Sequence, residues 1–537
     1  MRTTTLGYPF TLLTTLALFA PGCFGPGDQD ASAAQSDGAS AGGVDTNAGG
    51  GTTGAGSDGG SASDTAATGS PGGTGGSDAP DPEPDPEDSG EEASSSGGTS
   101  TGEPACDDQT AVELYLSPDD SNSMSSPVQV RSKVLSAGSS IAGAPIRIWE
   151  FLNYYSFDYP AAEPGTLALH TSLLHEDDAP QGEFKLQIAV TSPALNNADR
   201  AKMNLTLVLD ESGSMSGSPM SMQRETCRVI ASSLRSGDIV SVVGWDTSNA
   251  IKLSGHEASG ANDPVILDTC NGLSAGGGTD LHGGLTAGYD LAQQYYDNSR
   301  INRIVLMSDG GANAGVTDEE LIAQHAGSQD EDGIYMVGVG VGEGSYNDLL
   351  MDHVTDIGKG ASVFIDSADE AQKIFGDRFV STMAVAARDV QVQLDMPPGF
   401  EIVKFSGEEF SAVPEEIEPQ HIAPNDAMVF HQSIATCAPE LAGDEAEITV
   451  TARFLNAVTF EAQEVTLTVT IGELLEQSDP QLLKGAAIFA YAEGLKLARD
   501  EGDTAGLAAA QTAIVRAEEV LPGDADLAEM RSVLDAM

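Results

Sequence analysis

The sequence predicts a doubly wound, Rossmann-like α/β module over residues 203–383, set in or flanked by a β-rich, sandwich-like domain and followed by a C-terminal helical segment. Within the module, short and nearly continuous apolar runs indicate strands that are buried on both faces. Helical segments separate these runs, as parallel strands require. On either side the pattern changes to alternating strands, so the module has a β-rich setting.

The first 23 residues are typical of a bacterial secretory signal, because Arg2 precedes an apolar run that ends in small residues before Cys23. The last of these residues resemble a lipoprotein box, although Ala20 and Pro21 stand where the usual pattern has Leu and a small residue. We expect lipidation at Cys23, since a long polar segment follows; an ordinary signal peptide is the alternative. No later stretch has the ~20 apolar residues that span a bilayer, so we expect membrane contact through this anchor alone.

Residues 24–105 form an acidic linker rich in Gly, Ser and Pro, without Lys or Arg. Such a segment cannot bury enough apolar surface to offset its chain entropy, and we expect it to be disordered. Phe24 stands where an Asp would retain a lipoprotein at the inner membrane, so we expect an exported protein of the outer membrane or cell surface.

Residues 106–200 form an N-terminal α+β flank. An amphipathic helix is predicted over 146–155, and alternating strands over 167–173 and 184–190.

The module itself follows over 203–383, with one strand–helix alternation after another. Its apolar strands are predicted at 205–209, 239–243, 304–307, 334–339 and 363–365. Its helices are predicted at 219–234, 280–297, 318–326 and 368–383. The sequence therefore predicts a parallel sheet covered on both faces.

Residues 387–472 are β-rich again, with strands predicted at 390–394, 447–452 and 465–469, and residues 473–537 are helical with a break at Pro522 and Gly523. We hypothesise that 106–200 and 387–472 pair into one sandwich-like domain with the module inserted between them. Both flanks are strand-rich and each carries a single cysteine. Two separate flanking domains are the alternative.

Apart from Cys23, the chain has four cysteines: Cys106, Cys227, Cys270 and Cys437. In an exported protein an even number is compatible with two disulfides, for which three pairings exist, or with buried free thiols. We favour Cys227–Cys270 within the module and Cys106–Cys437 between the flanks.

Chemistry-bearing residues gather where strands of the module end. Asp210, Ser212 and Ser214 leave the first strand, Thr279 opens a helix after three glycines, and Asp309 ends a later strand. Ligands of an open α/β sheet lie beyond the carboxyl ends of its strands. Oxygen ligands of this kind suit a hard divalent cation.

Together these residues resemble the metal-ion-dependent adhesion site of the von Willebrand factor A (VWA) family. All five family ligand positions match: Asp210, Ser212, Ser214, Thr279 and Asp309. The resemblance implies that three hydroxyls contact the ion, that the two carboxylates bind it directly or through water, and that a partner's carboxylate takes the last position. Mg²⁺ is the expected metal, with Mn²⁺ or Ca²⁺ as alternatives.

The resemblance extends beyond the module. Residues 147–155 and 157–160 are similar to the segment that precedes the domain in bacterial proteins of the YfbK-like group, and 387–472 to the region that follows it. This likeness covers roughly 130–475. It implies a fold more than an activity.

Other polar residues near the site are interpreted as structural. Glu211 and Asp280 are expected to cap helix N-termini, and Asp246 to lie near the rim of the site. His282 is expected to be a surface or packing residue. No Ser/His/Asp order, Cys/His pair or phosphate-binding Gly-Lys-Ser/Thr motif is present, so we expect no catalysis.

The net charge of −58, from 82 acidic and 24 basic residues, excludes nucleic acid as a favourable partner. We expect a metal-dependent binding module, for adhesion or assembly, whose partner is a protein or other ligand that offers a carboxylate. One alternative is a structural scaffold of an envelope complex whose metal stabilises the fold. The other is a metal-dependent hydrolase.

Overall fold

The computed structural model describes residues 106–118, 123–136, 140–175, 180, 182–311, 333–342, 346–358 and 360–537. The predictions for the signal with Cys23, for the linker over 24–105 and for a helix over 318–326 lie outside the described residues.

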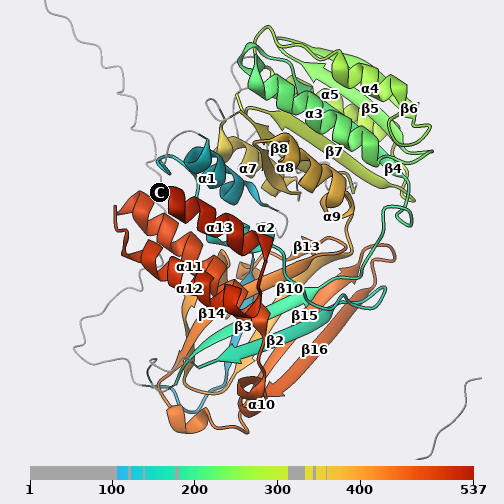
Figure 1. Ribbon diagram of the computed structural model, residues 1–537. Coiled ribbons are helices and arrows are strands. Elements are labelled where there is room, and N and C mark those ends of the chain that lie inside the picture. Colours follow the sequence, from blue (N-terminus) through green and yellow to red (C-terminus); the bar gives the residue numbers. More distant parts are fainter. Residues whose placement is uncertain are drawn as a thin grey trace, which may run out of the picture. The chain divides into compact units, whose positions relative to one another are not determined.

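The α/β module contains one six-stranded sheet in the order β6-β5-β4-β7-β8-β9 (Figure 1). Its strands are β4 (Met203–Asp210), β5 (Ile239–Trp245), β6 (Asn249–Glu257), β7 (Ile301–Ser308), β8 (Tyr335–Val341) and β9 (Ser362–Ile365). Five strands are parallel, as predicted, and every residue of β4 and β8 is buried. The sixth, β6, is antiparallel to β5 and largely exposed, so the prediction of an all-parallel sheet was wrong at this edge.

Helices cover both faces of this sheet. They are α3 (Ser218–Ser233), α4 (Pro264–Asn271), α5 (Leu281–Gln294) and α7 (Asp348–Ile357). Leu207 of β4 packs on the side of α3, while its neighbour Val208 packs on the side of α5, as side-chain alternation requires. Gly288 lets α5 approach β4 closely, because a Cβ there would overlap Val208.

The helix predicted over 368–383 is divided into three parts. They are α8 (Ala368–Gln372), a π-helical turn (Lys373–Asp377) and α9 (Phe379–Met383). The N–H of Arg378 donates to the carbonyl of Lys373 at 2.9 Å, five residues back, which widens the helix locally. Gly376 lies in this turn, where its low helix propensity favours an interruption.

Two antiparallel sheets lie below the module in Figure 1 and enclose a second core. One holds β1 (Val112–Ser117), β10 (Ala387–Met396), β12 (Glu409–Ser411), β13 (Gln420–Ile422), β15 (Glu447–Asn456) and β16 (Ala462–Thr470). The other holds β2 (Ala168–Leu174), β3 (Glu183–Thr191), β11 (Phe400–Phe405) and β14 (Ala427–Thr436).

Both sheets combine strands from before and after the module, because β1 pairs with β10 and β3 pairs with β14. This pairing confirms the inserted arrangement. A disulfide between Cys106 and Cys437, with Cα atoms 5.7 Å apart, also joins the two flanks.

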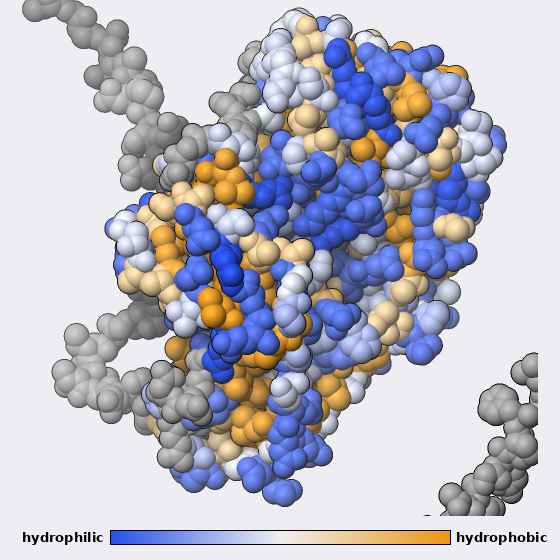
Figure 2. Space-filling model, viewed as in Figure 1, coloured by the Kyte–Doolittle hydropathy of each residue, from blue (hydrophilic) through white to orange (hydrophobic). Residues whose placement is uncertain are grey.

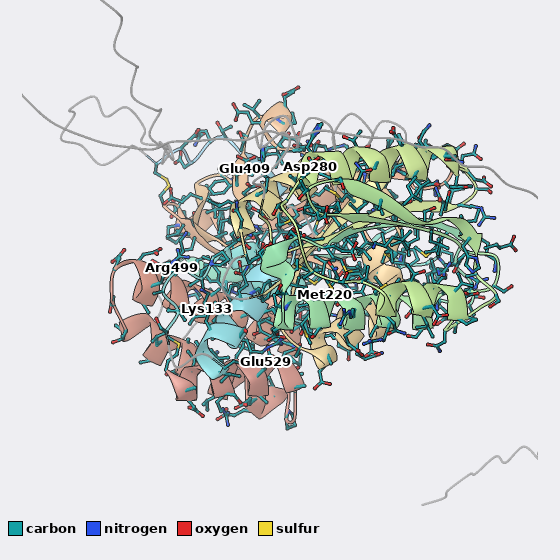
Figure 3. All side chains as sticks on the ribbon, turned by 90° about the horizontal axis from the view of Figure 1, so that it is seen from above. Lys133, Met220, Asp280, Glu409, Arg499 and Glu529 are labelled. Carbon is teal, nitrogen blue, oxygen red and sulfur yellow. A yellow bond between two sulfur atoms is a disulfide. The ribbon has the colours of Figure 1, made fainter. Side chains whose placement is uncertain are left out.

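A helical layer lies beside both parts. It consists of α1 (Ser125–Leu135), α2 (Ile148–Tyr154), α11 (Pro480–Asp500), α12 (Ala505–Val520) and α13 (Ala525–Ala536). The short helix α10 (Ile471–Glu476) lies apart from this layer and packs Ile471 and Leu474 into the core of the sandwich. The predicted helix over 146–155 corresponds to α2, and the break at Pro522 and Gly523 separates α12 from α13. In Figure 3, Lys133 on α1 lies beside the helices that carry Arg499 and Glu529. No helix in the described part of the chain has both the length and the apolar run to cross a bilayer.

Arg131 of α1 connects this layer to the module. Its guanidinium forms ion pairs with Asp366 at 2.8 Å and Glu370 at 2.9 Å, and with Glu529 of α13 at 3.0 Å. The side chain is only 15% exposed, so these charge-assisted bonds are poorly screened by solvent. The module, α1 and the C-terminal helices are therefore packed as one body.

Candidate metal centre

The first loop of the site follows β4. Asp210 is the last residue of this strand, and a 3₁₀ turn (Gly213–Met215) comes directly after it. The N–H of Ser212 donates to Oδ1 of Asp210 at 2.8 Å, and the hydroxyls of Ser212 and Ser214 lie 3.0 Å apart. The turn therefore brings one carboxylate and two hydroxyls together.

The second loop precedes α5 and is tied to the first by backbone hydrogen bonds. The N–H of Gly213 donates to the carbonyl of Gly277 at 3.2 Å, and that of Gly276 donates to the carbonyl of Glu211 at 2.7 Å. Gly277 has a φ of +83°, and a Cβ there would lie 2.9 Å from Oδ2 of Asp246. A glycine is therefore required at this close approach, which sets the position of Thr279.

The third loop follows β7 and ends beside the other two. Ser308 donates its hydroxyl to Oδ2 of Asp210 at 2.6 Å. A Cβ added to Gly311 would lie 3.4 Å from Oδ1 of Asp309 and 3.8 Å from Cγ2 of Thr279, so these two side chains are neighbours. The structure thus brings all five predicted ligand residues to one edge of the sheet.

The centre is largely closed to solvent. Asp210, Ser212 and Asp309 are fully buried, Thr279 is 2% exposed, and Ser214 is exposed. Burial raises the pKa of Asp210 to about 6; hydrogen bonds from Ser308 and Ser212 oppose this effect, and the charge of Asp309 adds to it. A cation held between these groups would favour the charged carboxylate.

The donor set fits a hard cation. It contains carboxylate and hydroxyl oxygens and no nitrogen or sulfur, as Mg²⁺ and Ca²⁺ prefer. In the described ranges, no three His, Cys, Asp or Glu side chains form a metal-binding group, so any ion here depends on the hydroxyls as well as on the two acids. Asp210 forms no ion pair with any described residue.

Ser308 was not singled out from the sequence. Its hydroxyl holds Asp210, and its own Oγ accepts the N–H of Gly310 at 2.9 Å. Its place as the last strand residue before Asp309 puts it near the site, but nothing local in the sequence indicates its bond to Asp210.

The residues interpreted as structural have defined partners. Asp280, labelled in Figure 3, caps α5 by accepting the N–H of Gly283 at 2.9 Å, as predicted. Glu211 does not cap a helix, so that prediction was wrong. It forms an ion pair with Lys252 at 2.6 Å and accepts the N–H of Ser274 at 2.9 Å, because it lies beside β6 rather than above α3.

A second disulfide lies on the α3 face of the module. Cys227 of α3 is bonded to Cys270 of α4, with Cα atoms 5.7 Å apart and both side chains fully buried. It fixes α4 to the helix that follows the first metal-site loop.

Comparison with known proteins agrees with this architecture. Residues 205–312 match the family model of the von Willebrand factor type A domain. Protein YfbK of Escherichia coli (strain K12) is 27% identical over 266 residues, which are 48% of this chain and 45% of YfbK. Protein sll0103 of Synechocystis is 26% identical over 220 residues, 41% of this chain and 51% of that protein.

A solved von Willebrand factor type A structure from Catenulispora acidiphila covers 68% of this chain and 89% of its own, with a TM-score of 0.44 at 15% identity. The chain is a von Willebrand factor type A domain protein. More particularly, it is similar to the YfbK-like bacterial proteins over about half of its length. It spans about half the length of the two bacterial relatives described above.

Proposed function

We propose that the module binds a divalent cation and, through it, a carboxylate of a partner protein or other ligand. The ion is Mg²⁺ in this proposal, with Mn²⁺ or Ca²⁺ as alternatives. Its ligands are Asp210, Ser212, Ser214, Thr279 and Asp309. The observation that carries the proposal is the convergence of these oxygen-bearing side chains from three loops at the carboxyl edge of one sheet.

The open side of the site supports binding of a partner. Ser214 is exposed, whereas Asp210 and Asp309 are buried, so a cation here would be shielded on the protein side and accessible on the other. Mg²⁺ usually retains water or an outside oxygen in its coordination sphere. A carboxylate is the natural replacement for such a water, because it is both charged and oxygen-bearing.

Metal binding is tested by titrating the full chain, freed of metal, with Mg²⁺ or Mn²⁺ in a calorimeter. Asp210→Ala and Thr279→Ala should abolish the heat of binding while near-ultraviolet circular dichroism stays unchanged. Asp280→Asn is the matched control: it lies next to Thr279 but caps α5, so its metal affinity should equal that of the natural chain. Equal affinity in all four proteins would refute the ligand assignment.

The open coordination position is tested separately with Mn²⁺, whose bound water shortens the relaxation time of solvent protons. Acetate should displace this water and reduce the relaxation enhancement. Acetamide has the same shape but no charge and should have much less effect. An enhancement that saturating acetate does not change would contradict the proposed carboxylate position.

A stabilising role is the second candidate, because two neighbouring acids, Asp210 and Asp309, are fully buried in the centre. A cation would neutralise them and stabilise the folded state, as any ligand specific to that state does. Calorimetric unfolding distinguishes the two functions. A large metal-dependent rise in Tm together with partner binding that persists in chelator favours the scaffold. A turnover screen with Mg²⁺ or Mn²⁺ tests for hydrolysis.

We further propose that the protein acts in the cell envelope, exported and lipid-anchored at Cys23. Pull-down from envelope extract, with and without EDTA, would identify a metal-dependent partner. Fractionation of a Cys23→Ser variant tests the anchor independently, since release of this variant from the membrane fraction is the expected result.

A further inference from the structure

A cavity of about 280 Å³ lies where three segments of the chain meet. One wall is formed after α2 by Phe157, Tyr159 and their neighbours Tyr155 and Ser156. Arg378 and Ser381 at α9 form the second wall, and Asn425 with Asp426, before β14, form the third. The volume is just below the roughly 300–1,000 Å³ of pockets for drug-sized ligands. It suits a molecule of the size of an amino acid or a dipeptide.

This cavity is separate from the metal centre. Met383, at the end of α9, accepts hydrogen bonds from the guanidinium of Arg303 at 2.8 and 3.0 Å. Arg303 lies near the amino-terminal end of β7, whereas Asp309 follows its carboxyl end. The cavity therefore lies by the opposite end of the sheet, and Figure 2 shows hydrophilic surface between the module and the helical layer.

Arg378 supplies a positive charge to the cavity. Its guanidinium donates to the carbonyl of Tyr154 at 2.9 Å and to the hydroxyl of Ser156 at 2.6 Å, and both bonds fix its orientation. Among the described residues it forms no ion pair. A guanidinium has five N–H donors, so others are left for an anion.

Asp426 supplies a negative charge to the same cavity. One of its oxygens accepts the N–H of Ala427 at 2.9 Å, and within the described ranges it also lacks an ion-pair partner. Burial raises its pKa to about 6, and the charge of Arg378 opposes this effect. At neutral pH the cavity thus holds one carboxylate and one guanidinium that do not pair with each other.

The turn that carries Asp426 is held in a costly conformation. Asn425 has a φ of +60°, and its side chain accepts the N–H of Leu195 at 2.8 Å and donates to the Leu195 carbonyl at 2.9 Å. A residue other than glycine in this left-handed region costs roughly 1 kcal/mol or more. The two hydrogen bonds offset this cost and fix the position of the neighbouring carboxylate.

An aromatic wall completes the cavity. The rings of Phe157 and Tyr159 are stacked, with centroids 6.1 Å apart and an interplanar angle of 18°. They provide the apolar part of the lining of the cavity.

We propose that this cavity binds a small zwitterion, whose carboxylate pairs with Arg378, whose ammonium group pairs with Asp426, and whose apolar part lies against Phe157 and Tyr159. Other ligand classes fit less well. Asp426 repels a dianion, Arg378 repels a dication, and a neutral apolar molecule would cover both charges and leave them without partners.

The test is calorimetric titration of the full chain with four probes that differ in the spacing of their charges: glycine, β-alanine, γ-aminobutyrate and L-alanyl-L-alanine. At least one should bind with a Kd of about 1 mM or tighter. Its N-acetylated and amidated forms each lack one charge and should bind roughly tenfold more weakly or worse. Absence of binding by all four probes, or equal binding of the blocked forms, would overturn the proposal.

Variants connect the binding to the cavity. Arg378→Gln and Asp426→Asn should each weaken binding roughly tenfold or more, because each removes one partner of a charge pair. Ser381→Trp should block the cavity and abolish binding while both charges remain. This variant tests the cavity even if the two charge variants fail to fold. Asp210→Ala and EDTA should leave probe binding unchanged, so this proposal and the metal proposal fail separately. If none of the three cavity variants loses affinity for the probe, the probe binds elsewhere on the protein and the proposal is wrong.

Discussion

The pair formed by Arg200 and Asp238 offers the sharpest test of how the module is held together. Both side chains are fully buried, and two bonds of 2.6 and 3.0 Å join them. Asp238 also accepts the backbone N–H groups of Met203 and Arg235, at 2.9 and 2.7 Å. One carboxylate therefore satisfies a buried cation and the backbone at the start of β4.

Asp238→Asn removes the negative charge but keeps the size of the side chain. It leaves Arg200 buried without a counter-charge, and the N–H groups of Met203 and Arg235 must compete for one amide oxygen. Breaking a buried pair in this way costs about 3–5 kcal/mol. By contrast, the exposed pair Arg228–Glu225, with side chains 40% and 37% exposed, should contribute less than about 1 kcal/mol.

The assay is urea unfolding followed by the fluorescence of Trp245, which is buried in β5. A Trp149→Phe background removes the other tryptophan, so the signal reports on the module. In this background, Asp238→Asn should lower the free energy of unfolding by at least about 3 kcal/mol. Glu225→Gln is the matched control. A cost for Asp238→Asn no larger than that of the control would refute the reasoning.

Acid adds a second test of the same pair. Burial alone would raise the pKa of Asp238, but the hydrogen bond from Arg200, the N–H of Arg235 and the charge of Arg200 lower it below the ordinary value. A carboxyl whose folded-state pKa is lowered contributes stability above its unfolded pKa of about 3.9. This contribution is lost as the pH falls through the folded pKa, and Asp238→Asn should remove that part of the acid sensitivity.

Two predictions concern β14, which faces α11 on one side and the sandwich core on the other. Burial lowers the pKa of His431 to about 3, so the unfolded chain binds more protons than the folded chain below about pH 6.5. The free energy of unfolding should therefore fall by up to about 4 kcal/mol as the pH decreases from 6.5 towards 3. In the His431→Gln variant the unfolding midpoint should depend less on pH. An equally steep dependence in the variant would contradict this. Gln432 is fully buried, and its amide has no hydrogen-bond partner among the described residues. Gln432→Met should therefore raise the free energy of unfolding by about 1 kcal/mol or more. If a urea titration shows instead that the variant is less stable, the amide has hydrogen-bond partners in the folded protein.

The candidate metal site could be located from the sequence because its residues follow strand ends. Asp210 and Asp309 directly follow apolar runs, and parallel strands bring their carboxyl ends to one edge. Ser308 could not be recognised in this way. Its hydroxyl bonds to Asp210, 98 residues earlier, and a contact over that distance leaves no local pattern.

The fold was predicted best where burial on both faces leaves a continuous apolar run, as in β4 and β8. β6 was missed because it is an exposed edge strand with mixed composition. The role of Glu211 was misjudged for the same reason, since its partner Lys252 belongs to β6. An acid just before a helix is expected to cap that helix. Glu211 instead pairs with Lys252, because β6 lies beside it in the folded protein.

The sequence alone determined the class of fold of the module and predicted which residues gather at one edge of its sheet, because both depend on periodicity and on where strands end. That the module is inserted between two pairing flanks was a hypothesis, and the pairing of β1 with β10 and of β3 with β14 decided it. The tertiary structure decided what depends on distant segments meeting. It placed Arg378 and Asp426, 48 residues apart in the numbering, on the walls of one cavity, and it brought Arg131 to acids of two different parts of the chain. The physical reason is that the protonation and the ion pairs of a charged side chain depend on its neighbours in space. The local sequence does not show which residues those neighbours are.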